Sequence, residues 1–163
     1  TQLARLRGAQ VVAAVREEKQ VAFAKEHGAH AVVVVGNDPA KAAAQGPYDL
    51  ILESVGGESL SAATRMLAID GTCVTFGISG GTEAKIEISP FYIKGGGSIY
   101  GLAMFHELAR EPARIGLARL ASLMADNRLK AHIALEKPWT AIDEVARELQ
   151  GRSYIGKAVL HLT

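Results

Sequence analysis

The sequence predicts a doubly wound, parallel α/β sheet, and two observations carry this prediction. Short apolar segments with β-branched residues alternate with segments of helical period along the chain, as in strand–helix–strand crossovers. The apolar strands 48–53 and 72–77 each run directly into a glycine-rich bend, and parallel sheets bind ligands beyond such strand ends. Because helices usually cover parallel sheets, we expect both faces of these strands to be buried.

The composition is that of an ordinary soluble domain. The 163 residues are 48% hydrophobic and 21% charged, with a net charge of +1, which suits one domain with a sizeable core. Basic residues are interleaved with acidic ones, so we expect neither nucleic acid nor a membrane as a partner. No apolar stretch could span a bilayer and no signal segment opens the chain, which predicts a cytoplasmic location. The single cysteine, Cys73, excludes an internal disulfide and is expected to pack inertly.

The first third of the chain is expected to alternate helices and strands. Leu3 and Leu6 share one face of a short helix that Gly8 ends. Asp38 offers an N-cap, followed by Pro39 at the first helical position. The other expected elements are strand 10–15, helix 17–27, strand 31–35 and an Ala-rich turn that ends at Gly46.

In the middle of the chain, strand 48–53 leads to a helix over residues 58–69. Apolar spacing of i, i+3, i+4 and i+7 defines its buried face, formed by Leu60, Ala63, Thr64 and Leu67. After strand 72–77, charged and apolar residues alternate until Pro90, which ends any strand there. Three consecutive glycines then precede a short apolar strand over 98–102.

The last third is expected to hold two more helices and two strands. Pro112 opens a helix that Asn127 can cap, and Thr140 with Asp143 resembles a capping box. The remaining expected elements are strand 131–136, a helix with the apolar stripe Ile142, Val145, Ala146 and Leu149, and strand 156–162.

Three segments resemble the cofactor domain of medium-chain dehydrogenase/reductases. They are Tyr-Asp-Leu-Ile-Leu-Glu-Ser-Val-Gly-Gly at 48–57, Gly-Thr-Cys-Val-Thr-Phe-Gly at 71–77 and Gly-Lys-Ala-Val-Leu at 156–160. The order and separation of these motifs are similar to the quinone oxidoreductase and zinc-binding-dehydrogenase-like branch. The resemblance implies a Rossmann-like domain over 1–163, with 131–163 as the return toward a catalytic domain. It further implies an NAD(P)H-dependent oxidoreductase that passes hydride to a carbonyl, a quinone or an activated alkene.

The chain departs from the family pattern at its beginning. No G-x-G-x-x-G occurs, and residue 1 falls inside what resembles the helix after the phosphate loop. We therefore expect a piece of a larger enzyme, without catalytic residues or catalytic competence of its own. The absent central strand would separate strands 10–15 and 31–35 from strands 48–53 and 72–77, and segment 156–162 is a candidate to fill the gap.

The preferred cofactor is expected to be NADP, with NAD as the alternative. NAD enzymes place an acid at the end of the second Rossmann strand, whereas a cation there suits the 2′-phosphate of NADP. Here the strand ends in Arg16, and a guanidinium holds a phosphate through paired, charge-assisted hydrogen bonds. The plain alternative is a solvated Arg16 whose field Glu17 and Glu18 partly cancel.

The resemblance places the other cofactor contacts at the glycine bends and near the closing motif. Residues 54–56 are expected on the adenine-ribose side, although serine and glycine also form ordinary turns. Residues 76–78 fall near the nicotinamide ribose, the alternative being a packed aromatic and a bend. For Lys157, a solvated lysine is an equal alternative. The full set of expected contacts is Arg16, Ser54, Val55, Gly56, Phe76, Gly77, Ile78, Leu102 and Lys157.

Other functional classes receive weaker support. The five histidines lack metal-ligand spacing, so no metal site is expected, and Tyr92 and Lys94 lack the spacing of the short-chain dehydrogenase pair. A non-catalytic nucleotide-binding or interaction module remains the alternative, and a methyltransferase is a third option. The edge strand 98–102 predicts a homodimer whose sheets continue across a two-fold axis, as the resemblance also implies.

Overall fold

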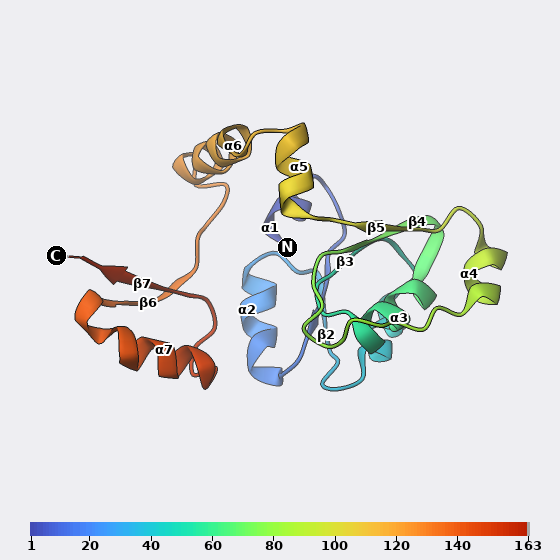
Figure 1. Ribbon diagram of the computed structural model, residues 1–163, viewed down its shortest axis with the longest axis horizontal. Coiled ribbons are helices and arrows are strands. Elements are labelled where there is room, and N and C mark those ends of the chain that lie inside the picture. Colours follow the sequence, from blue (N-terminus) through green and yellow to red (C-terminus); the bar gives the residue numbers. More distant parts are fainter. Residues whose placement is uncertain (163) are drawn as a thin grey trace. The chain divides into compact units, whose positions relative to one another are not determined.

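The computed structural model describes residues 1–162, and Figure 1 shows their helices and strands in chain order. The chain divides into two compact units, one over residues 1–117 and the other beginning at Ala118. Within residues 1–162, no helix has the length and apolar character needed to cross a lipid bilayer.

The first unit begins with a helix and a pair of parallel strands. Helix α1 (Gln2–Leu6) precedes strand β1 (Val12–Val15), which pairs with β2 (Ala31–Val34) in register from Val12 and Ala31 to Val15 and Val34. The connection is a 3-10 turn, η1 (Glu18–Gln20), continued by helix α2 (Val21–Glu26). The expected helix over 17–27 is therefore two elements, because the capping box between Glu17 and Gln20 tightens its first turn.

A three-stranded parallel sheet forms the rest of this unit. Its order is β3 (Tyr48–Glu53), β4 (Leu67–Thr75) and β5 (Ser98–Gly101). The 3-10 segment η2 (Pro39–Gln45) leads into β3, and the Asp38 carboxylate accepts a hydrogen bond from the Ala40 amide at 3.1 Å. Helix α3 (Gly57–Arg65) lies against β3 and β4, and helix α4 (Ile88–Lys94) follows the long segment after β4 (Figure 1).

The core of this sheet lies between α3 and the neighbouring strands. Ala63, Leu67 and Cys73 are buried together, and three partly buried side chains pack against them: Ile51, Leu60 and Phe91. The apolar stripe expected from the sequence thus faces the core. The expected cover on both faces is wrong for β3, because Leu50 and Leu52 remain 58% and 66% exposed.

The strands do not join into one sheet. Among residues 1–162 the hydrogen-bonded groups are β1-β2, β3-β4-β5 and β6 (Ile133–Pro138) with β7 (Lys157–His161). The expected separation of the first two groups is confirmed. The expectation that segment 156–162 fills the gap is wrong, because β7 pairs in parallel with β6.

The remaining helices are α5 (Met104–Arg110), α6 (Ala113–Ala125) and α7 (Ile142–Gln150), which follows the 3-10 turn η3 (Trp139–Ala141). The expected capping box at Thr140 and Asp143 is wrong, because Ala141 is the N-cap and no side chain caps the helix. Val145 is buried as the stripe predicted.

Two differences from the expected elements have a physical cause. The helix expected over 58–69 ends at Arg65, because Leu67 pairs with Tyr48 and so begins β4 early. Helix α4 contains Pro90 in its first turn, where a missing N–H costs nothing, so a residue read as a strand breaker is compatible with a helix.

Candidate functional site

The residues that follow the three strands β3, β4 and β5 are aligned at the carboxyl edge of this sheet. The register aligns Glu53 with Thr75 and Thr75 with Gly101, so the next residues are Ser54, Phe76 and Leu102. Two backbone hydrogen bonds extend this register, from the Phe76 amide to the Glu53 carbonyl at 3.0 Å and from the Leu102 amide to the Thr75 carbonyl at 2.9 Å. Three separate expectations from the sequence therefore fall on one edge, where parallel sheets bind ligands.

Apolar groups at this edge remain open to solvent. Val55 is 42% exposed, Phe76 50%, Ile78 68% and Leu102 40%. Flat, partly apolar rings bind to such surfaces, provided that a few polar groups orient them. The edge thus offers a partly apolar surface on which a flat ring could bind.

The two glycine bends that leave β3 and β4 are interlocked. The Gly80 amide donates to the Val55 carbonyl at 2.6 Å, and Gly56 and Gly81 form a parallel bridge. A Cβ at Gly77 would overlap the carbonyl of Ser54, and one at Gly57 would lie 2.8 Å from the Gly80 oxygen. Glycine is required because each backbone occupies the space of the other's missing side chain.

The buried carboxylate of Glu53 anchors the first bend. It accepts hydrogen bonds from the Val55 amide at 2.7 Å and from the Gly56 amide at 3.0 and 3.1 Å. The Thr75 hydroxyl donates to the same carboxylate at 3.4 Å. Because a carboxylate of the chain already occupies these amides at the start of α3, this bend is not an open nest for a phosphate.

Arg16 lies at the carboxyl end of β1, next to the residues that follow β2. Its Nη2 donates to the Asn37 side-chain oxygen at 3.4 Å, and its amide donates to the Gln20 side chain at 3.0 Å. The Glu17 carboxylate forms an ion pair with Lys19 at 2.9 Å. Because Lys19 partly neutralises Glu17, this carboxylate weakens the positive field of the exposed Arg16 guanidinium less than an unpaired one would.

The structure brings together some of the expected contacts but not all. Residues 54–56, 76–78 and 102 share the edge of the three-stranded sheet, whereas Arg16 ends a strand of the other sheet in the first unit. Lys157 is the first residue of β7 in the second unit, where it is exposed and its amide donates to the His132 carbonyl at 3.1 Å.

The described residues do not provide a zinc site. No group of three or more His, Cys, Asp or Glu side chains in residues 1–162 could hold a metal ion. Instead, the His27 ring stacks on Phe23 at 4.1 Å between centroids, and His161 lies 2.8 Å from the Glu136 carboxylate.

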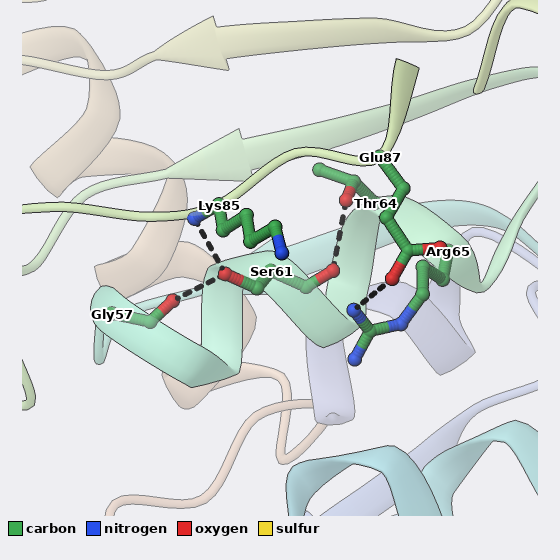
Figure 2. A network of polar contacts seen from close by, with 6 residues as sticks. All are labelled: Gly57, Ser61, Thr64, Arg65, Lys85 and Glu87. Atoms are coloured by element: carbon green, nitrogen blue, oxygen red, sulfur yellow. Dashed lines mark hydrogen bonds and ion pairs between the residues drawn. The ribbon is translucent and has the colours of Figure 1, made fainter. Parts of the chain in front are cut away.

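A network of polar contacts holds the segment after the second bend against α3 (Figure 2). The Ser61 hydroxyl donates to the Gly57 carbonyl at 3.2 Å and accepts from the Lys85 amide at 2.9 Å. Arg65 pairs with Glu87 at 3.2 Å. The segment that leaves the bend is thus attached to α3 at two points.

A hollow between η2 and α3 lies at the carboxyl end of α3. The two cationic side chains that line it, Arg65 and Lys94, both have partners within the chain. Arg65 pairs with Glu87, and the Lys94 ammonium donates to the carbonyls of Arg65 and Leu67 at 2.8 and 3.0 Å. These bonds satisfy carbonyls at the carboxyl end of α3. Lys94 therefore has a structural role at the end of this helix.

The thiol of Cys73 is buried in the middle of β4, opposite Ile51 and Ile99 in the neighbouring strands. Burial, with a smaller contribution from the negative charge of Glu53, raises its pKa to about 11. A thiol that stays protonated is a poor nucleophile, which agrees with the expected packing role.

The fold and its open strand ends define a Rossmann-like domain, and comparison with known proteins gives its family. The sequence pattern of the zinc-binding dehydrogenases matches residues 1–121. The chain belongs to that family, within the medium-chain dehydrogenase/reductase superfamily, as its motifs predicted. No curated protein matches the chain in sequence.

Solved structures share this fold. A mycobacterial quinone oxidoreductase is 20% identical with a TM-score of 0.84, over 98% of this chain and 51% of its own. A mycobacterial protein solved with NADPH is 20% identical with a TM-score of 0.79, over 98% and 51%. A 2-haloacrylate reductase is 23% identical with a TM-score of 0.81, over 98% and 52%. The chain thus spans about half the length of these proteins.

Sequence reasoning missed three features of the site. Asn37 could have been found by the rule that selected Arg16, because it also follows a strand of the same sheet. The role of Glu53 has no signal in the sequence, because its bonds to the bend depend on local backbone geometry. The contact between Ser61 and Lys85 joins residues 24 apart, and no sequence signal predicts it.

Proposed function

We propose that this chain is the NAD(P)H-binding part of an oxidoreductase that transfers hydride between nicotinamide and a carbonyl, a quinone or an activated alkene. The observation that carries the proposal is the alignment of Ser54, Phe76 and Leu102 at one carboxyl edge, in a chain of the zinc-binding dehydrogenase family. The solved relative that contains NADPH supports a nicotinamide cofactor.

The residues of this chain would bind and orient the cofactor. When bound, the reduced nicotinamide supplies a hydride, and the protein contributes position and electrostatics. Ser54, Val55 and Gly56 would lie along the adenosine half, and Phe76 and Ile78 along the nicotinamide half. Their exposed apolar groups would exclude water from one side of the rings, which favours transfer to the substrate over side reactions.

We further propose that the cofactor is NADP and that Arg16 binds its 2′-phosphate. The guanidinium is exposed at a strand end, and its Nη2 donates a 3.4 Å hydrogen bond to Asn37. Its other donors can form the paired, charge-assisted bonds that phosphate accepts. NAD carries an uncharged hydroxyl in place of this phosphate, so it offers the cation no charged partner there.

The test is to measure the dissociation constants of NADPH and NADH for the complete gene product and its Arg16→Ala variant. We expect NADPH binding to weaken by about tenfold or more, the equivalent of one charged hydrogen bond, with NADH unaffected. Arg7→Ala, which removes another exposed arginine, is the control. Equal losses for both cofactors would refute the phosphate role. Binding without any hydride transfer would instead favour a non-catalytic nucleotide-binding module.

We also propose a cytoplasmic homodimer formed through β5. This strand pairs with β4 on one side, and Ile99 and Tyr100 are each 37% exposed. An apolar edge strand with unpaired backbone groups invites pairing with another chain. Sedimentation of the complete gene product at micromolar concentration checks this, and an Ile99→Pro variant, which removes an N–H that faces away from β4, should shift a dimer toward monomer. A wild-type protein that sediments only as a monomer would count against the proposal.

A further inference from the structure

We propose that Glu53 is a positioning residue that couples the two glycine bends, so that the two halves of the cofactor are placed by one buried carboxylate. This inference rests on the proposed function, since it concerns the same edge of the sheet. Glu53 itself is only 4% exposed and lies under the first bend.

The first step is the attachment of Glu53 to the bend after β3. The amides of Val55 and Gly56 donate to its carboxylate at 2.7 to 3.1 Å. Hydrogen bonds to an ionised acceptor are stronger than neutral ones, and these also complement the start of helix α3. The carboxylate therefore sets the backbone conformation of the segment proposed to contact the adenosine half.

The second step connects this carboxylate to the strand that carries the other bend. The Thr75 hydroxyl donates to Glu53 at 3.4 Å, and the Phe76 amide donates to the Glu53 carbonyl at 3.0 Å. The side chain and backbone of one residue thus engage Thr75, the last residue of β4, and Phe76, which follows it. Those residues lead directly into the segment proposed to contact the nicotinamide half.

The third step is the direct contact between the bends. The Gly80 amide donates to the Val55 carbonyl at 2.6 Å, and Gly56 bridges with Gly81. Packing of Gly57 against Gly80 leaves no room for a Cβ. A displacement of Val55 and Gly56 must therefore displace the second bend as well, because no gap between the backbones absorbs the movement.

The experiment compares the complete gene product with its Glu53→Gln and Glu53→Ala variants, and uses Glu58→Gln as the matched control. Glu58 is an exposed acid in the first turn of α3, the helix that follows the first bend. Glutamine keeps the shape of the side chain but removes the charge, whereas alanine removes every side-chain bond. Thermal unfolding of each variant verifies that it is folded.

Two readouts address the coupling. The first is hydrogen exchange of the Gly80 amide, which donates to the Val55 carbonyl and so reports on the contact between the two bends. The second is separate titration with adenosine 2′,5′-bisphosphate and with reduced nicotinamide mononucleotide, which probe the two halves. We expect faster exchange at Gly80 in both Glu53 variants and loss of affinity for both halves, by about tenfold in the alanine variant. Glu58→Gln should change neither.

The results separate the inference from the proposed function. Weaker binding of the adenosine half alone, with exchange at Gly80 unchanged, would mean that Glu53 acts only locally and would overturn the coupling. Unchanged behaviour in both variants would also overturn it. If the wild-type protein binds neither half, the proposed function fails, and exchange at Gly80 still decides whether Glu53 couples the bends.

Discussion

The buried hydroxyl of Ser61 links the backbone of its own helix to a distant extended segment. It donates to the Gly57 carbonyl at 3.2 Å and accepts from the Lys85 amide at 2.9 Å (Figure 2). Thr64, also buried, donates in turn to the Ser61 carbonyl at 2.8 Å. The segment that follows the second glycine bend is therefore held against α3 by a side chain that solvent does not reach.

Replacing this hydroxyl should destabilise the protein. In Ser61→Ala the Lys85 amide loses its partner, and we expect a loss of about 1–2 kcal/mol in the free energy of unfolding. Ser59→Ala on the same helix is the control, since it makes the same change in helix propensity. Denaturant unfolding of both variants is the measurement, and equal stabilities would contradict the prediction.

The close approach of the two bends should make Gly77 intolerant of any side chain. A Cβ at this position would overlap the Ser54 carbonyl, so Gly77→Ala should destabilise by about 1–3 kcal/mol through overpacking. Gly116 offers a sharp contrast, because nothing lies within 4 Å of its added Cβ inside helix α6. Gly116→Ala should stabilise by about 0.5–1 kcal/mol, as alanine does in helices. Changes of opposite sign in the free energy of unfolding, followed by thermal unfolding of the two variants, would confirm both predictions. A Gly77→Ala variant as stable as the wild type would show that the bends can separate.

The raised pKa of Cys73 predicts a loss of stability at high pH. Burial and, to a lesser extent, the charge of Glu53 raise this pKa from 9.0 to about 11. The unfolded thiol therefore ionises first, and the unfolded state binds fewer protons between these two values. Stability is fully present below pH 9 and should fall as pH rises toward 11.

Lysines and tyrosines also titrate in this window, so the measurement is a comparison of slopes. Denaturant unfolding at several pH values should show a shallower decline for Cys73→Ala than for the wild type between pH 9 and 11. At pH 6–8 the two slopes should agree. Identical slopes throughout would mean that the thiol does not experience its buried environment as proposed.

The order of the amino acids was sufficient to predict the fold class, the family and the position of most strands. Residues 48–53 form a strand as expected, and the strand expected over 98–102 forms over Ser98–Gly101, because short apolar runs bounded by glycine leave few alternatives. The expected contacts near residues 54, 76 and 102 share one edge for the same reason. In a parallel sheet, residues that follow neighbouring strands emerge at the same side.

Contacts between residues far apart in the chain set where elements end and which polar groups meet. Helix α3 stops at Arg65 because Leu67 pairs with Tyr48, and this pairing joins residues that local propensity cannot relate. The bonds of Glu53 to Thr75 and of Ser61 to Lys85 likewise connect residues 22 and 24 apart. Such contacts depend on the packing of whole elements, whereas a sequence pattern reports only on neighbours within a few residues.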